Sequence, residues 1–376
     1  MTLKALVIGG GIGGLSAAIA LSQAGLDVEV FERANEIHEA GAGISLWANA
    51  IDALDRLGLG GAVRAASVAY EVGGLRRSDG AVISSVATQE LVRILRIPVI
   101  VMHRADLIAA LSQAVPSGVV RLGAACVSAE QDGEGVEASF VDGRRVRGDV
   151  LIGADGLDSV VRAGLHADGA PRYSGCTAWR AVVPFDTRQV RASETWGFGH
   201  LFGQVPISGD RVYWYAARNQ PQGRVSARPK AELLQLFKGW HAPIEGLIGA
   251  AEESRILQND IFDRPVLKRW GAGRMTLLGD AAHPMTPFMG QGACQAIEDA
   301  VALGRHLRAG QDVPSALRAY ERERIPRANA FVNRSRQVGR LARLRNPVAV
   351  MLRNALLGRV SPERQARQLA RMIRTT

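Results

Sequence analysis

The chain has 376 residues, of which 47% are hydrophobic and 22% charged, a composition typical of a globular protein with a sizeable core. No apolar stretch reaches the roughly 18 residues that a membrane-spanning helix needs, which excludes a protein built on such helices. An apolar strand begins almost at the first residue, so we expect no signal peptide and a cytoplasmic protein. The 42 arginines against four lysines indicate the codon usage of a GC-rich bacterium.

The net charge of +10 is concentrated near the C-terminus. Residues 321–376 carry fourteen arginines and three acidic residues, whereas the rest of the chain is nearly neutral. No base-stacking aromatic residues accompany these arginines, so we do not expect a nucleic-acid partner. Apolar residues interleave with them and Pro347 and Pro362 interrupt them, which predicts basic amphipathic helices over 331–376. Docking onto the rest of the chain, a dimer contact and peripheral contact with an anionic membrane all remain open, and none requires membrane insertion.

The first motif follows a short apolar run, residues 3–8 (LKALVI), which predicts a parallel strand buried on both faces. Gly9, Gly11 and Gly14 come next in the spacing G-x-G-x-x-G. The first glycine permits a tight turn, the second a close approach of the backbone to a pyrophosphate, and the third close packing of a helix.

The residues after these glycines complete a nucleotide-binding unit. A helix is predicted over Leu15–Ala24 and a second strand over Leu26–Phe31, and Glu32 follows that strand. A carboxylate at this distance accepts hydrogen bonds from ribose hydroxyls and disfavours a free 2′-phosphate. The pattern therefore predicts bound FAD or NAD rather than NADP.

The second motif lies about 265 residues further on. Met275–Leu278 predicts a buried strand that ends at Gly279 and Asp280, where a carboxylate can hold a ribityl chain. A loop rich in proline and glycine leads to a helix predicted from about Ala293 to Leu307. Because a helix N-terminus stabilises negative charge, it suits the pyrimidine edge of a reduced flavin and favours FAD.

These motifs resemble the class A flavoprotein monooxygenases of the para-hydroxybenzoate hydroxylase fold. The resemblance covers nearly the whole chain and is closest to the short salicylate, urate and 6-hydroxynicotinate hydroxylases and zeaxanthin epoxidase. It is carried by GGGIGG at Gly9–Gly14, GAGISLWANA at Gly41–Ala50, HRADL at His103–Leu107, GADGLDS at Gly153–Ser159 and LLGDAAHP at Leu277–Pro284.

The resemblance implies an α/β fold in which a Rossmann-like FAD-binding domain is interleaved with a β-sheet substrate domain. We expect the discontinuous FAD domain at 1–70, 98–170 and 265–330, the substrate domain at 71–97 and 171–264, and C-terminal helices at 331–376. Within the substrate domain, strands are predicted over Thr177–Phe185, Thr195–Val205 and Arg211–Arg218.

The resemblance also implies the residues that contact FAD. They are Gly9, Gly11, Gly13, Gly14, Glu32, Arg33, Gly43, Arg104, Val127, Asp155, Gly279, Asp280, Pro287, Gly290, Gln291 and Gly292. Arg104 is expected to reach the phosphates or the ribityl chain. For Asp155 we favour a hydrogen-bond network within the protein over direct contact.

The implied chemistry is reduction of FAD by NAD(P)H, addition of O2, and transfer of oxygen from a flavin C4a-hydroperoxide to an electron-rich substrate. Tyr213, Tyr215 and Pro287 are the expected catalytic residues. His283, by contrast, is expected to bond nearby backbone. No second G-x-G-x-x-G serves the nicotinamide, and the choice between NADH and NADPH is not readable.

The substrate pocket is expected to be largely apolar, lined by Trp47, Leu201, Tyr213, Tyr215 and Phe288. Urate hydroxylases place an arginine where this chain has Leu201 and a carboxylate where it has Phe288, so urate is disfavoured. We expect a phenolic or polycyclic aromatic substrate whose hydroxyl bonds Tyr213. A substrate carboxylate would be costly unless Arg180 or His200 turns inward.

Other functions and properties stay open. The runner-up is an epoxidase of an isoprenoid or carotenoid double bond, followed by a flavin dehydrogenase or oxidase; a halogenase is disfavoured because no W-x-W-x-I-P segment occurs. A non-catalytic flavin protein is the last alternative. Cys126, Cys176 and Cys294 lack metal or redox spacing, so we expect reduced thiols and no metal site. The partner is a small molecule, and the protein is a monomer or a homodimer.

Overall fold

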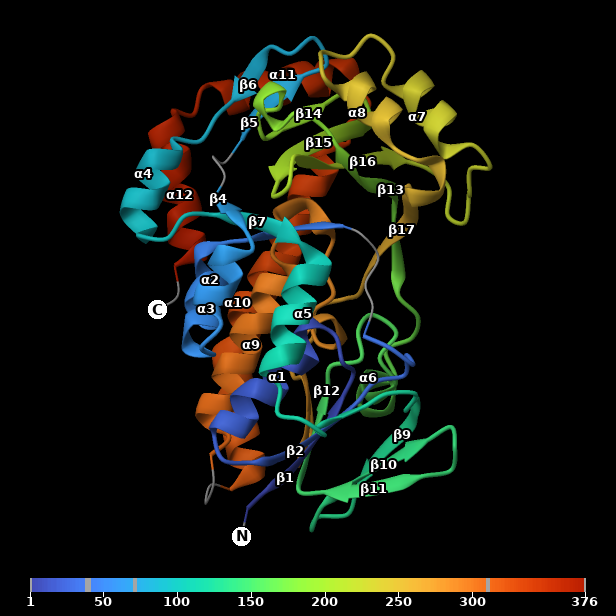
Figure 1. Ribbon diagram of the computed structural model, residues 1–376, viewed down its shortest axis with the longest axis vertical. Helices are drawn as coiled ribbons and strands as arrows, with labels where there is room; N and C mark the ends of the chain where they lie inside the picture. The colour runs from blue at the N-terminus through green and yellow to red at the C-terminus, as the bar shows by residue number, and fades with distance from the viewer. Residues whose placement is uncertain (1, 38–41, 70–72, 309–311, 375–376) are drawn as a thin grey trace.

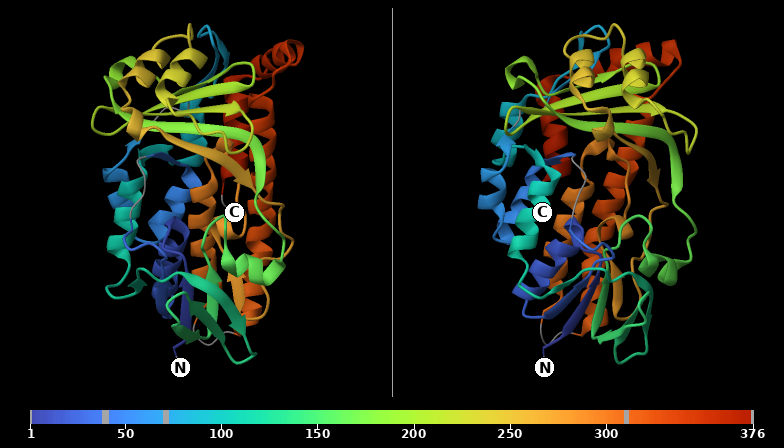
Figure 2. Two further views of the ribbon diagram at one scale, coloured as in Figure 1. Left: turned by 90° about the vertical axis from the view of Figure 1, so that its right-hand side faces the viewer. Right: turned by 45° about the vertical axis from the view of Figure 1, so that its right-hand side comes forward.

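The protein combines a parallel sheet with a larger, mostly antiparallel sheet that lies across the ends of its long helices (Figures 1 and 2). The computed structural model describes residues 2–37, 42–69, 73–308 and 312–374, so Gly41, which opens the 41–50 motif, lies outside them. This arrangement confirms the predicted α/β fold.

The parallel sheet has five strands in the order β18-β12-β1-β2-β8. Their bounds are Met275–Leu277, Val150–Gly153, Lys4–Ile8, Asp27–Phe31 and Val120–Arg121. Two small sheets accompany it, β11-β10-β9 (Arg145–Gly148, Val136–Phe140, Cys126–Gln131) and β3-β7-β4 (Gly43–Leu46, Ile100–His103, Val68–Ala69). The carboxyl ends of β1, β12 and β18 lie at one edge, because all three run parallel.

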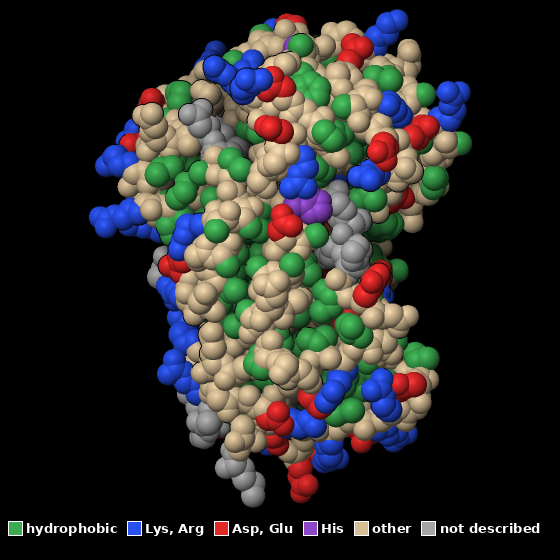
Figure 3. Space-filling view, viewed as in Figure 1, with side chains coloured by type: hydrophobic (Ala, Val, Ile, Leu, Met, Phe, Trp, Pro, Cys, Tyr) green, Lys and Arg blue, Asp and Glu red, His purple; other side chains and the backbone are tan. Residues whose placement is uncertain are grey.

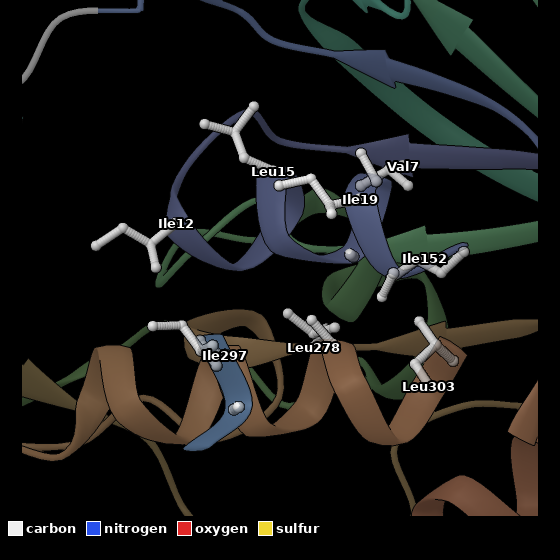
Figure 4. Packing of buried hydrophobic residues seen from close by; sticks show 14 of the residues in the cluster. Val7, Ile12, Leu15, Ile19, Ile152, Leu278, Ile297 and Leu303 are labelled. Carbon is white, nitrogen blue, oxygen red and sulfur yellow. The ribbon is translucent and has the colours of Figure 1, made fainter. Parts of the chain in front are cut away.

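The helices of this half lie beside the parallel sheet, as Figure 1 shows. They are α1 (Ile12–Gln23), α2 (Ala48–Arg56), α3 (Gly60–Ala65), α5 (Arg104–Ala114), α6 (Val160–His166) and α9 (Gly292–His306). Figure 4 shows α1 facing α9, with Leu278 and Ile297 among the buried side chains between them. Such continuous apolar burial is what the predicted strand and helix patterns require.

Helix α1 begins at Ile12, three residues before its predicted start. A Cβ on Gly13 would lie 2.7 Å from the Leu278 side chain, and one on Gly14 would lie 1.9 Å from the Gly9 carbonyl. Both glycines therefore belong to the first helical turn, where their lack of a side chain lets the helix pack closely on the strands.

The second sheet has seven strands in the order β17-β13-β16-β15-β14-β5-β6. Their bounds are Leu257–Asp263, Arg172–Pro184, Arg211–Asn219, His200–Ile207, Ser193–Trp196, Gly74–Arg77 and Val82–Ser84. Helices α7 (Pro229–Leu236) and α8 (Ile244–Ala250) cover its outer face, where Trp179, Phe202 and Trp214 are buried. Its inner face meets the half of the molecule that contains the parallel sheet (Figure 2).

The single strand expected over Thr195–Val205 is wrong. The segment forms two antiparallel strands, β14 and β15, joined by a turn at 197–199. Gly199 has a φ of +84°, a conformation that glycine adopts without strain, and this permits the reversal. Two glycines with one residue between them, Gly197 and Gly199, were the available signal.

The C-terminal part forms α10 (Val313–Ala342), α11 (Pro347–Gly358) and α12 (Pro362–Ile373). The predicted interruptions are confirmed, because Asn346 and Ser361 cap the two later helices ahead of a proline. Helix α12 lies beside α4 (Thr88–Leu95) and buries Ala366, Ala370 and Ile373. Docking onto the rest of the chain is thus what the structure shows, and Lys and Arg side chains recur along this edge in Figure 3. None of the helices formed by the described residues is long and apolar enough to cross a bilayer.

Candidate active site

The first glycine motif forms a turn that Glu32 holds from the end of β2. Its Oε2 accepts a hydrogen bond from the Gly10 amide at 2.6 Å, and its Oε1 accepts one from the Ala34 amide at 2.9 Å. Gly9 has a φ of +108°, and a Cβ there would lie 2.4 Å from the Ala154 carbonyl. A Cβ on Gly11 would meet no atom of the described residues within 4 Å, so among them this backbone is open to a ligand.

A small hollow of about 80 Å³ lies beside this turn. Its lining includes Gly9, Glu32, Arg33, Cys126 and Asp155. Val127 does not line it, and its side chain is 51% exposed. The hollow therefore joins the end of β2 to the GADGLDS segment that follows β12.

Asp155 links the end of β12 to the start of α6. Its Oδ1 accepts from the Ser159 hydroxyl at 2.5 Å, and its Oδ2 accepts from the Val160 amide at 2.8 Å. Burial raises the pKa of Asp155, although these hydrogen bonds oppose the shift. The carboxylate thus orders the turn that borders the hollow.

The second motif presents polar groups to solvent at the carboxyl end of β18. Asp280, Pro287 and Gly290 are exposed, whereas Leu278 and Ala281 beside them are fully buried. The Asp280 carboxylate is near Gly292, because a Cβ built there would lie 3.9 Å from its Oδ1. The strand end and the loop therefore face one open region.

Two further polar side chains belong to this region. Arg104 opens α5 after His103, and burial lowers its pKa while the charge of Asp280 opposes the shift. The indole Nε1 of Trp47 is buried with no hydrogen-bond acceptor among the described residues, and it faces Gly290. A buried donor of this kind suits a bound polar ligand, because leaving it unpaired is costly.

A buried charge network lies behind the second motif. The His283 Nε2 lies 2.5 Å from Asp299 Oδ2, which also accepts from the Gly279 amide at 3.1 Å. Arg324 donates to Asp299 Oδ1 and to Glu298 Oε2, each at 2.7 Å. The expectation that His283 bonds backbone is wrong, because a carboxylate from the next helix is its partner.

The buried charge network also contacts Gln291, in the loop before α9, and borders a larger cavity. The Asn49 amide donates to Gln291 Oε1 at 3.0 Å and also to Glu298, so α2 is tied to the residue that precedes α9. Asn49 and Glu298 also line a cavity of about 840 Å³ between α2, α9, α10 and α12. That cavity contains no residue of either glycine motif.

Strand register places a polar row across the inner face of the seven-stranded sheet. Arg180 of β13 pairs with Tyr215 of β16, Tyr215 pairs with Gly203 of β15, and Gly203 pairs with Glu194 of β14. The Tyr215 hydroxyl donates to Glu194 Oε2 at 2.5 Å. The Trp196 indole donates to Oε1 of the same carboxylate.

The expected pocket residues come together in part. Leu201, Tyr215 and Phe288 share one apolar cluster, and Tyr213 lies next to Tyr215 with ring centroids 5.8 Å apart. A Cβ on Gly43 would lie 2.5 Å from the Tyr213 ring, so this tyrosine contacts β3 in the half that contains the parallel sheet. Trp47 belongs to a different cluster, in that half.

The pocket is more polar than expected, because Glu194 and Arg180 share the inner face with the tyrosines. His200 turns the other way and packs on Phe237 and Trp240, with centroids 5.6 and 5.0 Å away. Val212 and Trp214 lie in the outer cluster, because successive side chains of a strand point to opposite faces of the sheet.

Comparison with known proteins follows this geometry. A family model described as an FAD binding domain matches residues 2–335. The chain is 43% identical over 365 residues to the aurachin C monooxygenase/isomerase of Stigmatella aurantiaca, covering 96% of this chain and 95% of that protein. It is 39% identical over 347 residues to the 3-amino-4-hydroxybenzoate 2-monooxygenase PtmB3 of Streptomyces platensis, covering 89% and 87%.

The chain belongs to the class A FAD-dependent monooxygenases. The structure of HpxO from Klebsiella pneumoniae, complexed with FAD and uric acid, superposes with a TM-score of 0.92 at 31% identity, covering 99% of this chain and 96% of that one. FAD is therefore the cofactor of this monooxygenase. The open backbone at Gly11, the unpaired Trp47 donor and the exposed Asp280 fit such a ligand.

The cysteines of this monooxygenase are free thiols. Burial raises the pKa of Cys126 and Cys176 to about 11 and that of Cys294 to about 12. Each is therefore protonated at neutral pH and a poor nucleophile.

Proposed function

We propose that this monooxygenase uses NAD(P)H and O2 to hydroxylate a phenolic or polycyclic aromatic substrate between the inner face of the seven-stranded sheet and the 287–292 loop. The observation that carries the proposal is the Tyr213–Tyr215 pair, which faces Gly43 and Phe288 of the FAD half. Two relatives whose names state an oxygenation, of aurachin C and of 3-amino-4-hydroxybenzoate, support the reaction class.

Several groups would hold the cofactor. Gly9, Gly11, Gly13 and Gly14 would approach the pyrophosphate, and Glu32 and Arg33 would bind the adenosine. Arg104 and Asp280 would hold the ribityl and phosphate region, while Asp155 would act through the turn that it orders. The amides of Gly290, Gln291 and Gly292 would face the pyrimidine ring, with Gly43, Gly279 and Pro287 against the ring system. We do not assign a contact to the side chain of Val127. When bound, FAD supplies the reduction of O2 and the electrophilic oxygen.

The chain's own residues orient the substrate and exclude water. Tyr213 would bond the substrate hydroxyl, because it lies where the sheet meets Gly43. Leu201 and Phe288 would cover the aromatic ring, since they pack in one cluster with Tyr215. Pro287 would shape the loop at the reacting edge. A dry pocket strengthens each hydrogen bond to the substrate.

Epoxidation of an isoprenoid double bond is the alternative. The zeaxanthin epoxidase of Nicotiana plumbaginifolia is 35% identical, although this chain covers only 55% of that protein. An isolated double bond offers no hydrogen-bond acceptor to the Arg180 guanidinium, and desolvating a charged group without a partner is costly. The polar row therefore favours the phenolic substrate.

The test is NAD(P)H oxidation by the FAD-loaded protein with peroxide followed in parallel, across phenols, polycyclic aromatics and isoprenoid alkenes. We expect a phenolic compound to accelerate NAD(P)H loss with little peroxide. Acceleration by an alkene alone would favour the epoxidase, and acceleration with stoichiometric peroxide for every compound would contradict oxygen transfer.

A further inference from the structure

We propose that Glu194 is a positioning residue that fixes the Tyr215 hydroxyl as a hydrogen-bond acceptor, so that the site selects substrates presenting an O–H or N–H donor to it. The inference rests on the proposed function, because it assumes that the inner face of the sheet binds the substrate. Glu194 belongs to none of the sequence motifs, and its contact defines which substrate group can meet the Tyr215 oxygen.

The backbone register places these groups side by side. Directly paired residues of antiparallel strands have Cβ atoms about 5 Å apart, so Arg180 and Tyr215 are immediate neighbours. Glu194 lies two strands from Tyr215, which is about 10 Å along the sheet. A tyrosine can reach that far only if the strand between them carries no side chain.

Gly203 supplies that gap. The Tyr215 ring lies directly over it, because a Cβ built on Gly203 would lie 2.0 Å from the ring's Cζ atom. The hydroxyl consequently reaches Glu194 Oε2 at 2.5 Å. A hydroxyl bound to a carboxylate is at the strong end of hydrogen bonds, so the orientation is well held.

The donor inventory then determines what Tyr215 offers to a ligand. Burial raises the pKa of Glu194, whereas the hydrogen bonds from Trp196 and Tyr215 stabilise its ionised form and oppose the shift. A phenolic hydroxyl has one proton and the ionised carboxylate can only accept, so in this form the Tyr215 proton is committed to Glu194. Any ligand group that meets the Tyr215 oxygen must therefore donate. The Trp196 indole donates to the other carboxylate oxygen and holds Glu194 in place.

Arg180 extends the pattern on the opposite side of Tyr215. Its guanidinium can only donate, and within the described part of the chain it forms no hydrogen bond or ion pair. The row therefore offers an acceptor at Tyr215 beside a cation at Arg180. It fits an aromatic hydroxyl or amino group that has a carbonyl, carboxylate or phenolate oxygen next to it.

The test uses binding alone, followed by the absorption spectrum of the FAD-loaded protein. Each probe is a hydroxyarene paired with its methyl ether, namely 2-naphthol with 2-methoxynaphthalene and 3-hydroxybenzoate with 3-methoxybenzoate. We expect the wild type to bind the hydroxyl member at least about tenfold more tightly, because the ether cannot donate a hydrogen bond to the Tyr215 oxygen. Glu194→Gln and Tyr215→Phe should each reduce that preference about tenfold, and the double variant no further, since both act through one contact.

Controls separate positioning from folding. Glu252→Gln removes an exposed carboxylate of the same half and should leave the preference unchanged. FAD content per chain reports on folding, and the preference is a ratio that general destabilisation does not move. An unchanged preference in Glu194→Gln would overturn the inference, as would a wild type that binds no hydroxyarene better than its ether, absence of binding included. Selective binding without substrate oxygenation would instead contradict the proposed function and leave the Glu194 inference standing.

Discussion

Glu32 and Gly10 are joined by a hydrogen bond of 2.6 Å from the Gly10 amide to the Glu32 carboxylate, which ties the end of β2 to the turn of the first glycine motif. The same side chain accepts from the Ala34 amide, so it orders two turns at once. We expect Glu32→Gln to raise the dissociation constant of FAD about tenfold or more, because an amide keeps only one acceptor oxygen.

Flavin fluorescence on titration of the apoprotein measures this effect. Glu29→Gln is the matched control, because Glu29 lies on β2 just before Glu32 and forms partly exposed ion pairs with Lys4 at 3.2 Å and Arg121 at 3.6 Å. Equal FAD affinity in both variants would contradict the role of Glu32.

The buried Asp299 should matter for stability rather than for FAD contact. Its carboxylate pairs with Arg324 at 2.7 Å and with His283 at 2.5 Å, and all three side chains are almost fully buried. We expect Asp299→Asn to lower the free energy of unfolding by about 3 kcal/mol, because it leaves the Arg324 charge partly uncompensated. Urea unfolding of the holoprotein at pH 7 measures the change, and Asp142→Asn at an exposed pair should change it little.

The same group gives a pH dependence. Burial alone would raise the pKa of Asp299, but His283 and Arg324 outweigh it and hold the pKa at about 2. An aspartate has a pKa near 3.9 in the unfolded chain. Because the folded value is depressed, the stabilisation is complete above about pH 5 and is lost as the pH falls through 4 toward 2. We expect Asp299→Asn to reduce this loss of stability below about pH 5. An unchanged loss in the variant would contradict its attribution to Asp299.

The polar row depends on the absence of a side chain at position 203. Gly203→Ala places a Cβ 2.0 Å from the Tyr215 ring, so we expect the ring to move and its bond to Glu194 to break. The KM for the substrate should rise about tenfold. Steady-state kinetics measure it, with Gly249→Ala of α8 as the control, since a Cβ there meets nothing within 4 Å. Equal KM values in the two variants would show that Tyr215 tolerates displacement.

Tyr213 is the second group expected to act on the substrate. Burial raises its pKa, although the Arg180 and Arg104 charges oppose the shift, so its hydroxyl is protonated at neutral pH and can donate. We expect Tyr213→Phe to reduce kcat/KM about tenfold or more. Unchanged substrate affinity and hydroxylation rate together would remove Tyr213 from the site.

Helix α12 should stabilise the fold through packing rather than charge. Ile373 is 1% exposed, and Arg327 donates to the carbonyls of Met372 and Ile373 at 3.2 and 2.9 Å. We expect deletion of residues 361–376 to lower Tm by about 5 °C or more. Replacing the exposed Arg364 and Arg367 with glutamine should leave Tm unchanged, and the opposite pattern would indicate that charge matters.

The sequence was sufficient for the local units of the fold. The strand, the three glycines, the helix and Glu32 are consecutive, and each residue type has one geometric reason to be there. Asp280 followed from the same reasoning, because a short apolar strand precedes it. Within the first glycine motif only the start of α1 was misplaced, because glycines predict a turn even where they belong to a helix.

Glu194 could not be predicted, because its meaning depends on strand register. Its partner Tyr215 is 21 residues away, and nothing local indicates that Gly203 lies between them. The buried charge network could not be predicted for the same reason, because Arg324 reaches Asp299 from a helix 25 residues later in the chain. Without the tertiary structure, a carboxylate is expected to lie in solvent, because its buried partner cannot be identified from the sequence.

The most direct test of the central claim is the source of the oxygen in the product. The FAD-loaded protein should be run with NAD(P)H and 18O2 on the compound that best stimulates NAD(P)H oxidation, and the product analysed by mass spectrometry. If the protein transfers oxygen as proposed, we expect a single 18O on the aromatic ring, beside the original hydroxyl. A product without 18O, or NAD(P)H oxidation that yields only peroxide with every compound, would contradict it.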